Sequence, residues 1–219
     1  MTNRELEAIK LNIIDTCRQL EKLGYFIGTW GNVSIRVPGG MIITPSRISY
    51  DVLVPGDFVT VGEDGTIVEG HRRPSSEADT HRAVYRVKPE VGAIVHSHSP
   101  YASAVSCMHR SIPPIVEEIS QIIGGEIKCT KYVPAGRHQQ LAAAVAKTIG
   151  EVQAVLVANH GVVCCGRDLP EALVASQIVE KAAQMMLAAS PGGKLHRIPQ
   201  KLVQEERHRY LYKYGTPHD

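Results

Sequence analysis

The stretch AIVHSHSPYASAVS, residues 93–106, decides how the chain is interpreted, because it joins an apolar run to an H-x-H pair and then to a Ser-Pro step. The run has the length and composition of a buried β-strand, and Pro100 fits the first turn of a following helix. Alternate side chains of a strand share one face, so His96 and His98 point the same way. Two neutral imidazoles at one strand end suit a divalent metal ion, whereas the plainer alternative is a pair of half-exposed polar residues.

A second apolar strand, AVLVAN at residues 154–159, ends in a similar way, with His160 followed directly by Gly161. A glycine beside the histidine allows a tight turn that aims the ring back at the sheet end. A histidine at such an edge also commonly forms only local hydrogen bonds. Three imidazoles leave one coordination position open, which is typical of a catalytic rather than a structural zinc site.

The sequence PSSEADTHRAVYR supplies further polar groups at the start of a predicted helix. Ser76 is expected at its N-cap, with Asp79 closing a capping box. Glu77 lies in the first turn, where the helix dipole favours a carboxylate whatever else it does. With His81 on the same helix face, Glu77 forms an alternative metal pair, which we rank below the three histidines. Ser75 and Ser76, together with the free N–H groups of the helix start, form a natural anion cradle.

The rest of the chain alternates short strands and helices without a repeat or a domain linker. Hydrophobic periodicity and turn residues predict strands at 33–37, 41–45, 57–61, 66–70, 92–97, 126–133, 154–159 and 162–165. Helices are predicted at 6–23 after a Thr2–Glu5 capping box, at 77–86, from 100, near 114–123, at 137–149 and at 170–190 after Asp168, before a polar tail with three tyrosines. We therefore expect one α/β domain over residues 1–219, a layered α/β/α sandwich in which helices cover a central, mostly antiparallel sheet.

The composition is that of an ordinary globular protein, with 43% hydrophobic residues and a net charge of +2. Its basic residues form no stripe with interleaved aromatics, so we expect no nucleic-acid partner. No apolar run approaches the roughly 20 residues that span a bilayer, and the opening MTNRELEAIKLNII is unlike a signal peptide, so we expect a cytoplasmic protein with no membrane partner. The five cysteines are odd in number and lack a C-x-x-C pair, which argues against a disulfide framework. The adjacent Cys164 and Cys165 are expected to be small buried residues in a strand.

Five motifs, taken together, resemble a known family. GTWGNVSIR, MIITPS, PSSEADTHRAVY, AIVHSHSPYASAVS and NHGVVCCGRDLPEALVASQIVE are similar, in order, to the successive motifs of the class II aldolase/adducin family, especially its L-fuculose-1-phosphate aldolase-like members. The resemblance implies that zinc is held by Glu77, His96, His98 and His160. It also implies that the substrate phosphate is bound by Asn32, Ser46, Ser75 and Ser76, in agreement with an anion cradle at a helix start.

The chemistry implied by this resemblance is reversible cleavage of a ketose 1-phosphate to dihydroxyacetone phosphate and an aldehyde. Zn²⁺ would stabilise the developing enediolate by Lewis acidity, although Mn²⁺, Co²⁺ or Fe²⁺ would also suit such ligands. Glu77 is the implied acid/base for the proton at C3. Suitable substrates are phosphates of the L-fuculose, 5-deoxyribulose or methylthioribulose type, because the motifs do not identify the aldehyde half.

The sequence departs from the family pattern at two places. Glu117 stands where the fuculose-phosphate aldolase has a tyrosine after R-S-I-P, with Glu118 beside it, and we expect Glu117 to be the base for the C4 hydroxyl. Arg47 replaces a glycine and would either contact phosphate or narrow the pocket. Tyr214 matches a tail tyrosine that family members lend to a neighbouring subunit, which implies a homotetramer with catalytic sites between subunits.

Three other functions remain open on the same scaffold. The nearest is a methylthioribulose-1-phosphate dehydratase, which uses a glutamate in the region of Glu117. A pentulose-phosphate 4-epimerase is less favoured, because epimerases typically have aspartate where this chain has Glu77. A non-catalytic interaction module like the adducin head would have lost metal ligands, and all four are present here. The aldolase is therefore the preferred interpretation.

Overall fold

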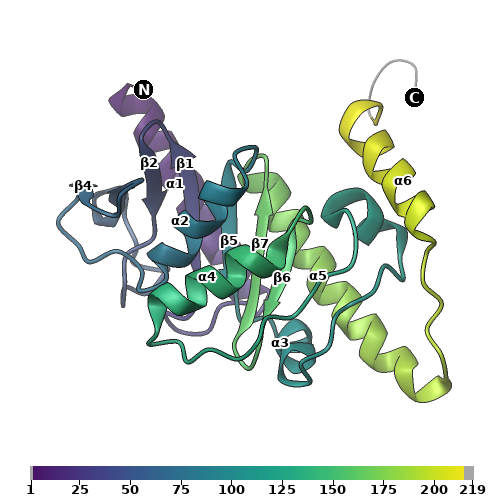
Figure 1. Cartoon of the computed structure of the whole chain (residues 1–219). Helices are drawn as coiled ribbons and strands as arrows, with labels where there is room; N and C mark the ends of the chain where they lie inside the picture. Colours follow the sequence, from purple (N-terminus) through teal and green to yellow (C-terminus); the bar gives the residue numbers. More distant parts are fainter. Residues whose placement is uncertain (1, 215–219) are drawn as a thin grey trace.

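A seven-stranded sheet forms the centre of the computed structural model, which describes residues 2–214 (Figure 1). Its strand order is β4-β3-β2-β1-β5-β7-β6, and every neighbouring pair is antiparallel. The strands are β1 (Asn32–Val37), β2 (Gly40–Ile43), β3 (Val59–Gly62), β4 (Ile67–Glu69), β5 (Ala93–Ser97), β6 (Ala154–Val157) and β7 (Gly161–Gly166). The expectation of a mostly antiparallel sheet is confirmed.

Helices cover both faces of this sheet, as Figure 1 shows. They are α1 (Asn3–Lys22), α2 (Ala78–Val87), α3 (Pro100–Cys107), α4 (His138–Ile149), α5 (Leu169–Ala189) and α6 (Gln200–Tyr212), with short turns η1 (Pro55–Asp57), η2 (Ile119–Ile123) and η3 (Ser190–Gly192). Helices α2 and α4 lie side by side on one face, and α1, α3 and α5 cover the other. The predicted α/β/α layering is therefore present.

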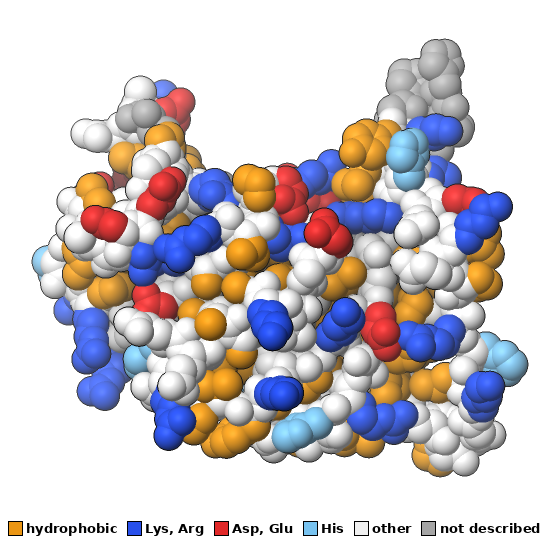
Figure 2. All heavy atoms as spheres, in the orientation of Figure 1, with side chains coloured by type: hydrophobic (Ala, Val, Ile, Leu, Met, Phe, Trp, Pro, Cys, Tyr) orange, Lys and Arg blue, Asp and Glu red, His pale blue; other side chains and the backbone are white. Residues whose placement is uncertain are grey.

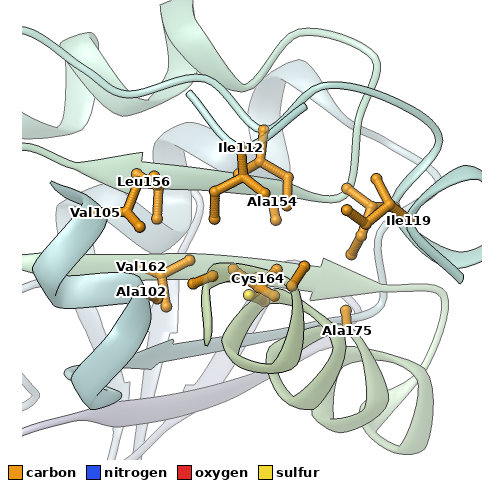
Figure 3. Packing of buried hydrophobic residues seen from close by; sticks show 14 of the residues in the cluster. Ala102, Val105, Ile112, Ile119, Ala154, Leu156, Val162, Cys164 and Ala175 are labelled. Atoms are coloured by element: carbon orange, nitrogen blue, oxygen red, sulfur yellow. The ribbon is translucent and has the colours of Figure 1, made fainter. Parts of the chain in front are cut away.

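Successive side chains of each strand point to opposite faces of the sheet, so the core is divided between the two faces. In β5, Ile94 packs with Val84 of α2 and Val145 of α4, whereas Val95 packs with Ile13 of α1. Figure 3 shows a further cluster, in which β6 and β7 pack against α3, α5 and the segment around Ile112. Burial of each large apolar side chain stabilises the fold by about 1.5–3 kcal/mol. Because such side chains pack on both faces, the sheet is held in place from both sides.

Two helix starts have the predicted capping chemistry. Thr2 and Glu5 form the capping box of α1, and Gly24 follows its end with a left-handed φ of 72°. The side chain of Asp168 accepts a hydrogen bond of 2.8 Å from the backbone N–H of Glu171 at the start of α5. None of the described helices is both long enough and apolar enough to cross a membrane.

The start of α2 differs from the prediction. Its N-cap is Glu77 rather than Ser76, and no side chain caps it. The reason is that the preceding segment is tied to the loop after β2: the backbone N–H of Ser46 bonds to the carbonyl of Arg73, and that of Ser75 bonds to the carbonyl of Thr44. This pairing keeps the two serines in the segment before the helix and places Glu77 at its N-cap.

Other expected elements are also corrected. The segment 126–133 is not a strand, because Ile127 bridges Ile112 in antiparallel fashion while Cys129 bridges Leu156 in parallel fashion, so it does not run along one partner. The helix predicted near 114–123 forms only over its second half, where η2 is a π-helix. The polar tail contains helix α6, which packs against η2. The cysteines are all free, and the adjacent Cys164 and Cys165 are buried in β7, as predicted.

Candidate metal centre and anion pocket

The three predicted histidines meet at one point, although they come from two places in the sequence. Pairing of β5 with β7 sets Ser97 opposite Val162, so the turn that carries His160 lies beside the end of β5. The ring centroids are 5.0 Å apart for His96–His98, 5.0 Å for His96–His160 and 4.9 Å for His98–His160. One nitrogen from each ring lies within 4.8 Å of the others, as a shared metal ion requires.

Gly161 permits this approach, though by a different means from the one expected. The left-handed residue of the turn is Asn159, with a φ of 55°. A Cβ at Gly161 would instead collide with the backbone carbonyl of Ser97 and crowd the ring of His98. The glycine is therefore needed because two strand ends touch at the centre, not because the chain reverses there.

Glu77, at the N-cap of α2, completes the cluster. Its Oε2 lies 2.9 Å from Nε2 of His96, and its Oε1 lies 3.2 Å from Nε2 of His160. The side-chain amide of Asn32 donates a hydrogen bond of 2.8 Å to Oε2. Burial alone would raise the pKa of Glu77, but the charge and hydrogen bond of His96, with His160 and Asn32, outweigh it and hold that pKa well below its usual range.

The alternative pair of Glu77 and His81 is not formed. His81 is fully buried, and both of its ring nitrogens are engaged elsewhere, at 2.6 Å from Oδ1 of Asn32 and 2.6 Å from Oγ of Ser34. Its ring therefore lies behind Asn32 and does not reach the histidine cluster.

The protonation of the cluster suits a cation. Burial, together with the neighbouring histidines, lowers the pKa of His98 to about 3, and burial with the charge of His96 lowers that of His160 to about 4. Burial also opposes protonation of His96, but the charge and hydrogen bond of Glu77 outweigh it and raise its pKa. The Nδ1–H of His96 donates to the carbonyl of Val162 at 3.0 Å, which turns Nε2 toward the cluster. Without an ion, the Nε2–H of His96 faces Glu77. Once that proton is lost, the three imidazole nitrogens and the carboxylate form an N₃O donor set that fits a divalent ion.

A cavity of about 490 Å³ adjoins the cluster, and all four residues predicted to bind phosphate line it: Asn32, Ser46, Ser75 and Ser76. Glu77, His98 and His160 line the same cavity. Its lining also includes Arg47, Arg73 and His138, of which sequence reasoning had considered only Arg47. Two guanidinium groups at the rim give the cavity a positive field that favours an anion.

Some of these polar groups are already engaged within the chain. The hydroxyl of Ser46 donates to the carbonyl of Pro74 at 2.8 Å, and Oγ of Ser75 accepts from the N–H of Glu77 at 3.3 Å. The residue after Ser46 is Arg47, whose φ of 62° lies in the left-handed region. A residue other than glycine in this region costs about 1–2 kcal/mol, so the arginine occupies the pocket rim at the expense of backbone strain.

The two carboxylates and the tyrosine predicted near the chemistry do not line this cavity within the described chain. Glu117 is exposed. Glu118 is bonded to Lys181 at 2.6 Å. Tyr214, beyond the end of α6, is 62% exposed. The structure of one chain thus brings together the residues predicted to bind metal and phosphate but leaves these three apart from them.

Comparison with known proteins agrees with this geometry. The family described as Class II Aldolase and Adducin N-terminal domain matches residues 11–187, and the chain belongs to this family. Its relatives are named aldolases, so the chain is a class II aldolase.

Two curated relatives and one solved structure show how far the similarity extends. The L-fuculose phosphate aldolase of Haemophilus influenzae is 39% identical over 175 residues, which are 80% of each chain. A 5-methylthioribulose-1-phosphate/5-deoxyribulose-1-phosphate aldolase of Rhodospirillum rubrum is 32% identical over 209 residues, 95% of this chain and 92% of that one. A solved L-fuculose 1-phosphate aldolase superposes with a TM-score of 0.89 at 28% identity, covering 94% of this chain and 97% of the other.

Proposed function

We propose that this aldolase binds a divalent metal ion, with zinc as the first choice, and cleaves a ketose 1-phosphate reversibly to dihydroxyacetone phosphate and an aldehyde. The observation that carries the proposal is the shared cavity: Glu77 and two of the clustered histidines line it together with the serines and arginines suited to a phosphate. The candidate substrates are the 1-phosphates of L-fuculose, 5-deoxyribulose and 5-methylthioribulose. Relatives named for each of these aldolase types support that choice.

The chain's own groups account for two proton transfers. Cleavage of the C3–C4 bond leaves its electron pair on the dihydroxyacetone phosphate half, while the C4 hydroxyl loses its proton to a base. A bound divalent cation supplies Lewis acidity that stabilises the negative charge on the substrate oxygens. In the direction of bond formation, Glu77 takes the proton from C3 of dihydroxyacetone phosphate as an ionised carboxylate, the state that His96, His160 and Asn32 favour. In cleavage, the protonated Glu77 returns that proton to C3.

The test is metal analysis of the purified protein, followed by incubation with dihydroxyacetone phosphate and a panel of short aldehydes, including acetaldehyde, lactaldehyde and a methylthio aldehyde. About one metal ion per chain and formation of a carbon–carbon bond are expected. Loss of water from methylthioribulose 1-phosphate without release of an aldehyde would identify a dehydratase. Epimerisation at C4 would identify an epimerase, and a protein without metal or turnover would be an interaction module.

Glu117 is proposed as the base for the C4 hydroxyl, acting from another subunit. Its exposed position away from the chain's own cavity supports this arrangement. Glu117→Gln is expected to reduce turnover severely while the metal content stays at the wild-type level. Glu118→Gln is the matched control, because Glu118 is engaged with Lys181 and its loss is expected to have little effect on turnover. Normal turnover of the Glu117 variant would remove this residue from the mechanism.

A mixed oligomer tests the placement of Glu117 directly. If a catalytic site takes Glu77 from one subunit and Glu117 from its neighbour, co-expression of Glu77→Gln with Glu117→Gln leaves about a quarter of the sites intact in a randomly assembled homotetramer. Partial activity from two inactive parents is the expected result. Recovery of no activity from verified mixed oligomers would mean that both residues belong to the same chain's site. The same proposal takes Tyr214 into the neighbouring site.

Arg47 is proposed to contact the substrate phosphate. Arg47→Gly removes the strain of the left-handed backbone, so it is expected to stabilise the fold by about 1 kcal/mol in urea unfolding. It is also expected to raise KM about tenfold, because a charge-assisted hydrogen bond is lost. Arg47→Lys keeps the charge and the strain, and should give a smaller rise in KM. A stabilised glycine variant with unchanged KM would show that Arg47 only narrows the pocket.

A further inference from the structure

A chain of hydrogen bonds runs inward from Glu77 to the core between β1 and α2. Glu77 Oε2 is bonded to Nδ2 of Asn32 at 2.8 Å, and Oδ1 of Asn32 lies 2.6 Å from Nε2 of His81. On its far side, Nδ1 of His81 lies 2.6 Å from Oγ of Ser34, which lies 2.9 Å from the hydroxyl of Tyr85. Ser34 and His81 have no exposed surface, and Asn32 is 4% exposed, so water does not compete for these bonds.

The chemistry of the groups fixes the direction of every donor. A carboxylate only accepts, so Asn32 presents its amide N–H to Glu77 and its carbonyl oxygen to His81. That oxygen can only accept, so Nε2 of His81 carries a hydrogen and donates it. Burial lowers the pKa of His81 to about 3, which leaves the ring neutral.

With Nε2 protonated and the ring neutral, Nδ1 of His81 is an acceptor, and its donor is the hydroxyl of Ser34. The hydroxyl of Tyr85 then donates in its turn, to Oγ of Ser34 at 2.9 Å or to the carbonyl of Ser34 at 3.1 Å. From Ser34 through His81 and Asn32, each donor therefore points toward Glu77.

We propose that His81 is a positioning residue that locks the amide of Asn32 with its N–H toward Glu77, and so holds the Glu77 carboxylate in place for the metal ion. Without the Nε2–H of His81, the amide is free to turn over and to set its carbonyl oxygen against the carboxylate, where two acceptors repel. The proposal rests on the proposed function for the metal, while the hydrogen bonds themselves are a property of the fold.

Because of the position of Asn32, the amide orientation set by His81 also bears on substrate binding. Asn32 lines the cavity as well as contacting Glu77, so the orientation of one amide is shared by the metal centre and the anion pocket. Its nitrogen carries a second hydrogen, which remains for an anion in the cavity once the first is given to Glu77. His81, which lies behind both, thus couples metal affinity to phosphate binding without touching either ligand.

The main test measures zinc affinity by chelator competition in three variants of the full chain. His81→Phe keeps a planar ring but removes both hydrogen bonds, and its zinc affinity is expected to fall about 10- to 100-fold. His81→Gln restores an N–H donor and is expected to recover much of that loss. Val84→Ala is the control for general destabilisation, because Val84 lies on the same helix with no exposed surface and packs in the core. It should lower the melting temperature and leave zinc affinity unchanged.

Ser34→Ala gives a second test if His81→Phe does not fold. It removes only the hydroxyl that donates a hydrogen bond to Nδ1 of His81. His81 is then free to adopt the other tautomer, and a smaller loss of zinc affinity in the same direction is expected. The tautomer itself is measured by ¹⁵N NMR of the histidines, with an Nε2–H signal expected for His81 in the metal-free wild type.

The outcomes separate this inference from the proposed function. Wild-type zinc affinity in both His81→Phe and Ser34→Ala would overturn the positioning role and leave the aldolase proposal standing. An equal loss of affinity in Val84→Ala would also overturn it, because the effect would then follow from stability alone. A wild-type protein that binds no zinc would instead contradict the proposed metal chemistry.

Discussion

Replacement of His98 by alanine is expected to strip the metal from the protein and to reduce aldol cleavage by about three orders of magnitude or more. A Lewis acid contributes several kcal/mol to stabilisation of the transition state, and each 1.4 kcal/mol is a factor of ten in rate. His98 is one of the three imidazoles that meet at the strand ends, and with two nitrogens and one carboxylate left the site loses a quarter of its donors. Metal analysis and steady-state kinetics on the same preparation check both effects together.

The control for this variant is His196→Ala. His196 is an exposed histidine in the segment between α5 and α6, outside the cluster. Its replacement should leave metal content and turnover at wild-type levels. If His98→Ala kept both its metal and its turnover, the three histidines would not be a catalytic metal centre.

Replacement of Glu77 by glutamine is expected to lower kcat about 10²- to 10⁴-fold, the range that general acid–base groups contribute. The side chains have the same shape, so the packing around α2 is kept. Metal analysis of the same preparation separates loss of the proton transfer at C3 from loss of the carboxylate ligand. The kcat and KM for cleavage of the ketose 1-phosphate check this, and a circular dichroism spectrum like that of the wild type verifies the fold. A kcat within a factor of two of the wild type would exclude Glu77 as the acid/base group.

The same variant has a second, independent signature in the metal-free protein. The charge and hydrogen bond of Glu77 raise the pKa of His96 against the effect of burial. Glutamine removes that charge and leaves burial unopposed, so the pKa of His96 should fall. An NMR titration of the histidines in wild type and variant measures the change. A His96 that titrated at the same pH in both would show that the carboxylate does not act on it.

Much of the cluster was predictable because its signals are local. An H-x-H pair at the end of one apolar strand and a histidine directly after another need only the period of a strand to be read correctly. The serines before α2 were also recognisable from their sequence. Their exact role was not, because the N-cap is set by hydrogen bonds from Ser46 and Ser75 to residues distant in the sequence.

Other features depend on long-range packing and left no local signal. Arg73 and His138 line the anion cavity only because the loop before α2 and the start of α4 meet beside the sheet end. The segment 126–133 has the composition of a strand, yet it divides its contacts between Ile112 and Leu156. On the face seen in Figure 2, basic side chains are spread among other types, as the mixed charge of the sequence predicts.

The central place of β5 has a consequence for how the enzyme is made in a cell. Its two partners, β1 and β7, lie about 60 and 70 residues away in sequence, so β5 can be enclosed only after long stretches of chain have been synthesised and brought back. The ligands on β5 and after β6 cannot meet before that step. Binding of the proposed ion is therefore expected to be a late event in maturation, after β5 has paired with both of its neighbours.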